Sequence, residues 1–91
     1  MIDCGIGTFS KSDSDIDVGT IISTRITFNK KFNSTPVVVV SWREYFCNTY
    51  FDAVSMDNRT LSPIGFDAIT TIRNVNSWKS DWNFYWIAIE Q

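Results

Sequence analysis

The segment 83–90, NFYWIAIE, carries apolar side chains on both faces of any strand that it can form. Side chains alternate between the two faces along a strand. One face carries Phe84, Trp86 and Ala88, and the other carries Tyr85, Ile87 and Ile89. A chain of 91 residues builds one small core, which covers only one of these faces. We therefore expect the second face to meet another copy of the chain in a symmetric oligomer.

Length and composition predict one globular domain that spans residues 1–91. Hydrophobic residues make up 44% of the chain and aromatic residues 15%, which is enough for a real core. A net charge of -2 without any basic run argues against nucleic acid as a partner. The longest apolar run, residues 37–40, is far too short for membrane insertion.

The residues available for chemistry are few. There is no histidine, which excludes Ser-His-Asp and Cys-His nucleophiles and His-based metal sites. Cys4 and Cys47 allow one disulfide or two free thiols, and their spacing fits no metal motif. Asp52 and Asp57 form the best pair for a glycosidase, but nothing beyond their proximity in sequence marks them. We expect no enzymatic activity, no metal and no cofactor.

Strand-type residues dominate the sequence, and no long helical period appears. Extended segments are predicted at 20–28, 37–42, 45–56, 66–73 and 83–90. Turns are predicted at Asp57–Asn58 and at 62–65, where Pro and Gly occupy complementary turn positions. About six strands with short connections, all antiparallel, predict a β-sandwich.

Five short motifs follow one another along the chain: IDCG at 2–5, ITF at 26–28, PVV at 36–38, SPIGF at 62–66 and WIAIE at 86–90. In this order and spacing they resemble the H-type lectin domain of snail agglutinins and of the C-terminal part of discoidins. The resemblance covers essentially the whole chain. It implies a six-stranded antiparallel sandwich, with Trp86 on the core side.

The resemblance also implies a function and an assembly. Domains of this family form homotrimers, or hexamers of two trimers, and they have no catalytic activity. They bind N-acetylgalactosamine, galactose or related glycans in shallow clefts between neighbouring subunits. We accordingly expect glycans as partners and an extracellular or cell-surface location.

The resemblance also implies site residues, because each sugar-binding position of the family can be matched to a position in this sequence. A family aspartate from the neighbouring subunit corresponds to Asp17, and the position of a family arginine falls near Asp52. A tryptophan-histidine pair after the Gly-Phe strand is replaced here by Arg73 and Asn74. Trp78, in the polar loop 76–81, is the best candidate for a displaced sugar-stacking residue.

A family cysteine in the Gly-Phe strand is Thr70 here, so Cys4 lacks the partner that the resemblance implies.

Simpler interpretations stand beside these. Asp13, Asp15 and Asp17 do not form an EF-hand loop, because the sixth and twelfth positions hold Val18 and Thr24, and a solvated acidic loop explains them equally well. Asp52 with Arg43 would be an ordinary surface pair. The alternative function is a trimeric structural or receptor-binding adhesin tip, like that of a phage or viral fibre, without a sugar site.

Overall fold

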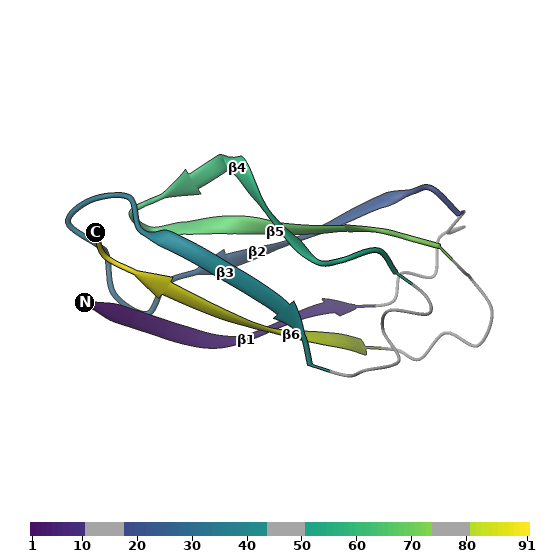
Figure 1. The fold of residues 1–91 in the computed structure, drawn as a ribbon, viewed down its shortest axis with the longest axis horizontal. Helices are drawn as coiled ribbons and strands as arrows, with labels where there is room; N and C mark the ends of the chain where they lie inside the picture. The colour runs from purple at the N-terminus through teal and green to yellow at the C-terminus, as the bar shows by residue number, and fades with distance from the viewer. Residues whose placement is uncertain (11–17, 44–50, 74–80) are drawn as a thin grey trace.

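The computed structural model describes residues 1–10, 18–43, 51–73 and 81–91, and within them the chain forms six strands and no helix (Figure 1). The strands are β1 (Ile2–Ser10), β2 (Ile21–Thr27), β3 (Val37–Trp42), β4 (Ser55–Ser62), β5 (Gly65–Thr71) and β6 (Asp81–Ile89). They form two antiparallel three-stranded sheets, ordered β1–β6–β3 and β2–β5–β4. The expected all-β antiparallel sandwich is confirmed. Within the described residues, no helix is long and apolar enough to cross a membrane.

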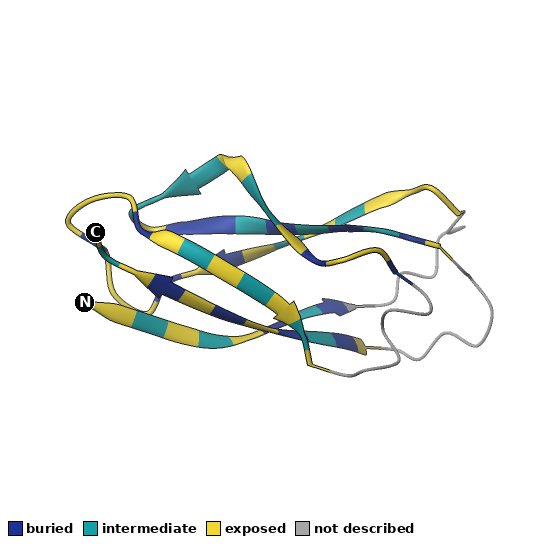
Figure 2. Cartoon of the chain, viewed as in Figure 1, coloured by how far each residue is buried: buried dark blue, intermediate teal, exposed yellow. Residues whose placement is uncertain are grey.

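The core lies between the two sheets and is rich in aromatic rings. β6 contributes Trp82, Phe84, Trp86 and Ala88, all buried, while the residues between them are exposed or half-buried (Figure 2). β5 contributes Phe66 and Ala68 from the other side. Phe28 packs against Phe66 and Trp86, and so bridges the two sheets. The alternation of β6 thus places Trp86 in the core, as expected.

Two glycines on the inner face of β1 make room for this core. A Cβ atom on Gly7 would overlap the ring of Phe84, and one on Gly5 would lie 2.9 Å from the Trp86 ring. Both glycines pair directly with β6, Gly5 opposite Trp86 and Gly7 opposite Phe84. Because Gly5 and Gly7 have no side chains, the large rings of Trp86 and Phe84 on β6 have room to pack against β1.

The turn predicted at Asp57–Asn58 is wrong. Both residues lie inside β4, whose pairing with β5 shifts register between Asp57 and Ser62. The Asp57 carboxylate accepts hydrogen bonds from the backbone N–H and the side chain of Arg59. Local bonds of this kind are typical of turns, but here they form inside an irregular strand. The turn at 62–65 is confirmed, because Ser62 pairs with Gly65.

Both chain ends lie at the same end of the sandwich (Figure 1). The Met1 amino group is 3.2 Å from Glu90 Oε2, and the Glu90 N–H donates to the Met1 carbonyl. Nearby, the Asp3 carboxylate accepts from the backbone and the amide side chain of Asn29, at 2.7 and 2.8 Å. These contacts join β1 to the end of β6 and to the connection that follows β2.

Candidate functional site

The segment 51–54 leads into β4 and carries one of the predicted site residues, Asp52. Phe51 is buried and forms an isolated bridge with Ile72. The next N–H, that of Asp52, donates to the Thr71 carbonyl at 3.0 Å. Because Phe51 is buried, alternation turns the Asp52 side chain outward, and it is 56% exposed.

Asp52 forms an ion pair with Arg73, the residue just beyond Ile72. Arg73 Nε lies 3.4 Å from Asp52 Oδ1, and the Arg73 side chain is 58% exposed. The structure therefore brings together two of the residues predicted for the site. Among the described residues, the partner of Asp52 is Arg73 rather than Arg43. An ion pair this exposed contributes only about 0–1 kcal/mol to folding, so both groups remain available to a ligand.

The Asp52 backbone is held from both sheets. Its carbonyl oxygen accepts a hydrogen bond from Trp42 Nε1 at 3.0 Å and a second from Thr70 Oγ1 at 2.9 Å. Trp42 ends β3 in one sheet, and the buried Thr70 belongs to β5 in the other. These two bonds fix the peptide that carries the Asp52 carboxylate.

A shallow hollow of about 310 Å³ opens beside Asp52 on the outer face of the β2–β5–β4 sheet. Strand pairing builds it, because Thr71 lies opposite Ile21 and Ile69 lies opposite Ser55. Its lining combines the apolar side chains of two isoleucines and an alanine, three hydroxyl-bearing residues and one carboxylate: Ile21, Ile69, Ala53, Ser55, Thr70, Thr71 and Asp52. A carboxylate thus lies at a partly apolar hollow, with a guanidinium beside that carboxylate.

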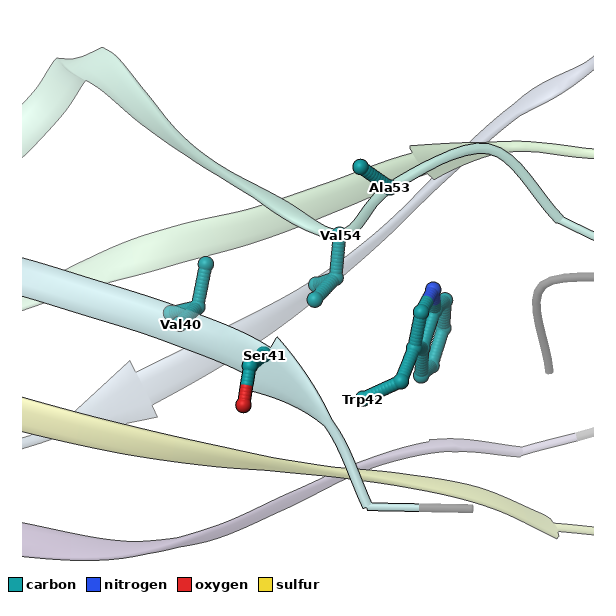
Figure 3. A pocket seen from close by; sticks show the side chains of 5 residues that line it. All are labelled: Val40, Ser41, Trp42, Ala53 and Val54. Atoms are coloured by element: carbon teal, nitrogen blue, oxygen red, sulfur yellow. The ribbon is translucent and has the colours of Figure 1, made fainter. Parts of the chain in front are cut away.

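A second hollow of about 300 Å³ lies on the other side of the same segment, lined by Val40, Ser41, Trp42, Ala53 and Val54. Figure 3 shows Val40 and Trp42 directed toward Val54, while Ser41 points away. None of the described residues that line this space is charged. It is a gap beside the Trp42 ring rather than a chemically equipped site.

The remaining predicted site residues, Asp17, Asn74 and Trp78, lie outside the described residues. The other three tryptophans have structural positions: Trp82 and Trp86 are buried, and Trp42 packs on Phe9, Phe51 and Phe84. Cys4 is an exposed free cysteine on β1, and its possible partner Cys47 lies outside the described residues.

Residues that line the hollow with Asp52 but were not identified from the sequence are Ile21, Ser55, Ile69 and Thr71. Alternation along β5 already turns Ile69 and Thr71 outward, but the contributions of Ile21 and Ser55 depend on the register of β2 and β4 against β5. The sequence does not reveal this register, so the hollow could not be predicted from it.

Other charges on this sheet are paired with each other. Arg25 Nη1 lies 3.4 Å from Asp67 Oδ1. Hydrogen bonds from the Arg59 side chain lower the pKa of Asp57, and the same bonds raise the pKa of Arg59. A lowered pKa leaves Asp57 without the proton that a general acid must donate near neutral pH. In the described part of the chain, no group of acidic or cysteine side chains has the arrangement of a metal site.

No protein-family model matches the chain, and a search of curated proteins finds no match either.

Proposed function

We propose that this protein is a carbohydrate-binding module that recognises N-acetylgalactosamine, galactose or related glycans without chemical turnover. The observation that carries the proposal is the Asp52–Arg73 pair beside the hollow. An ionised carboxylate accepts strongly from sugar hydroxyls, and a guanidinium donates through several N–H groups. The apolar side chains of Ile21 and Ile69 offer a surface for the C–H face of a sugar ring.

The resemblance to H-type lectins extends this proposal to the assembly. Three copies would form a homotrimer, and Asp17 of one copy would complete the site on the next, together with Asn74 and Trp78. A shallow exposed site binds one sugar weakly, and several linked sites raise the overall affinity by about 10²–10⁴ when the geometry allows. Glycans of this kind cover cell surfaces, so we also propose an extracellular or cell-surface location.

The test compares two ion pairs of the same sheet on a multivalent glycan array. Asp52→Asn and Arg73→Gln remove charges at the hollow. Asp67→Asn and Arg25→Gln are matched controls, because this pair has the same 3.4 Å separation but does not line the hollow. Loss of a charge-assisted hydrogen bond should weaken glycan binding about 10- to 100-fold in the first two variants alone.

Equal effects from both pairs would place the binding elsewhere on the molecule. Wild-type protein that forms its oligomer but binds no glycan would overturn the lectin proposal. Hydrolysis of a chromogenic glycoside would contradict the expectation that the protein has no enzymatic activity.

A second candidate function is a trimeric structural or receptor-binding tip without a sugar site. The observation that favours it is the set of exposed apolar side chains on the outer face of β6, Tyr85, Ile87 and Ile89, which suit assembly and lie on the other sheet from the hollow. The same array, combined with light scattering, separates the two functions, because a tip domain would form the trimer and bind no glycan.

A further inference from the structure

The edge strands of the two sheets differ in how well they are protected. Within the described residues, β1 and β3 are the edges of one sheet, and β2 and β4 are the edges of the other. An open edge exposes backbone N–H and C=O groups that can pair with another chain, and charged residues or bulges protect many such edges. Protection of this kind is present as Asp3 on β1, Arg25 on β2, and Asp57 and Arg59 on β4, whose pairing is also irregular.

β3, with the sequence VVVVSW, has neither form of protection. It carries no charged residue, and it pairs with β6 in unbroken register from Val37 to Trp42. Its four consecutive valines favour extended backbone. Among the described residues, no strand pairs with the other side of β3. This edge is therefore the one most open to a further strand.

One hydrogen bond shows which backbone groups of β3 face this edge. The N–H of Arg43, the residue after β3, donates to the Asn83 carbonyl at 3.0 Å, so it faces β6. Backbone groups of successive residues in an antiparallel strand point to opposite sides. The N–H and C=O groups of Trp42, Val40 and Val38 consequently point away from β6, toward the open edge.

The two ends of this edge have different chemistry. Pro36 occupies the next position of the same series and has no N–H to donate, so the open edge spans residues 38–42. At the other end the Arg43 side chain is exposed, and in the described part of the chain it takes part in none of the ion pairs. An added strand would place a residue directly opposite Arg43, where a negative charge is favourable.

The second hollow lies beside the same edge. It occupies about 300 Å³ between the end of β3 and the segment 53–54, and Figure 3 shows Val40 and Trp42 directed toward Val54 across it. The side chains of directly opposed residues in a strand pair point to the same face of the sheet. A residue added opposite Trp42 or Val40 would therefore direct its side chain toward this hollow. Because none of the described lining residues is charged, the hollow suits an aliphatic side chain.

We propose that an extended segment of a partner protein binds to the β3 edge as an additional antiparallel strand. Its backbone pairs with residues 38–42, as in other complexes formed by strand addition. The antiparallel direction matches every pairing in this sheet. The segment begins with an acidic residue opposite Arg43 and continues with alternating aliphatic and polar residues, of which the first aliphatic side chain enters the second hollow.

An NMR titration with the blocked peptide Glu-Leu-Thr-Val-Thr-Val tests the proposal. Its Glu lies opposite Arg43 and its Leu opposite Trp42. Binding should shift the backbone amide signals of Val38, Val40 and Trp42 and slow their hydrogen exchange at least about tenfold, because these groups become hydrogen-bonded. Replacement of the Leu by Gly should weaken binding at least about tenfold, because the burial of one aliphatic side chain is lost.

Two changes remove the backbone pairing itself. Val40→Pro deletes an N–H that faces the open edge but no hydrogen bond to β6, and it should abolish binding. Val40→Thr keeps the N–H and the β-branched shape, and this matched control should bind nearly as the wild type does. Circular dichroism verifies that both variants fold. A peptide N-methylated at its Leu and first Val lacks the pairing donors and should not bind wild-type protein, so the test stands even if Val40→Pro does not fold.

Charge reversal tests the acidic end of the partner. Arg43→Glu should weaken binding of the Glu peptide up to about fivefold and favour a peptide with Lys in place of Glu.

Three results would overturn the proposal. The first is a titration without amide shifts at Val38, Val40 and Trp42, and the second is equal binding of the N-methylated peptide. The third is a dimer in sedimentation velocity that Val40→Pro dissociates and that excludes the peptide, because a second copy would then occupy the edge. No glycan enters these measurements, so failure of the lectin proposal leaves their result unaffected.

Discussion

Gly7→Ala tests whether the missing side chains of β1 are what admits the aromatic core. The added methyl group would overlap the ring of Phe84, which has no exposed surface. Phe84 is surrounded by the rings of Phe9 and Trp42, so it has little freedom to move away. The substitution therefore adds volume to a space that is already filled.

Overpacking of this kind costs about 1–3 kcal/mol. We expect the upper end of that range, because the overlap involves the ring of a fully buried residue and not the far end of a flexible chain. A small domain has only about 5–15 kcal/mol of stability. A loss of about 3 kcal/mol corresponds to a Tm lower by roughly 12–24 °C at this chain length.

Urea and thermal unfolding followed by circular dichroism measure the effect, at one fixed protein concentration because association contributes to apparent stability. Cys4→Ala is the control, since Cys4 lies on the exposed side of the same strand. Combining Gly7→Ala with Phe84→Leu should cost less than the sum of the two single changes, because the smaller side chain accepts the methyl group. A Gly7→Ala variant as stable as Cys4→Ala would refute the reasoning.

Two further predictions concern the site and the chain ends. Asp17→Ala should abolish glycan binding on the array and leave the oligomer intact by light scattering; unchanged binding would remove Asp17 from the site. Burial raises the pKa of Asp3, but the hydrogen bonds that its carboxylate accepts, from Asn29 and Cys4 among others, together outweigh burial and hold that pKa below 3.8. The stability from Asp3 is therefore fully present above pH 3.8 and lost as pH falls through the lower folded value. Asp3→Asn should accordingly destabilise the protein at neutral pH and by less in acid, as shown by urea unfolding at several pH values; an equal loss at all pH values would contradict this.

The strand pattern of the sequence predicts most of the fold, with two instructive exceptions. β6 was predictable because alternating large side chains mark both of its faces. β1 gives a weaker signal, because two of its inward positions are glycine and their role appears only beside Phe84 and Trp86. β4 was misplaced because its irregular pairing allows turn-forming residues such as Asp57 within a strand.

The candidate site shows where local reasoning ends. Asp52 and Arg73 were both expected in a site, but their ion pair depends on the bridge between Phe51 and Ile72, which joins segments 21 positions apart in the sequence. Ile21 enters the hollow from a third segment. Alternation predicts which side chains point outward, whereas pairing between distant strands decides which of them meet.

The position of the two termini has a practical consequence for any display of this domain. The Met1 amino group and the Glu90 carboxylate form an ion pair at one end of the sandwich, next to the paired residues Ile2 and Ile89. The hollow lies toward the opposite end, where Ile21 begins β2 opposite Thr71 (Figure 1). A tag, a surface anchor or a neighbouring domain attached at either terminus would therefore leave the hollow facing away from the point of attachment, so immobilised protein should retain full access to soluble ligands.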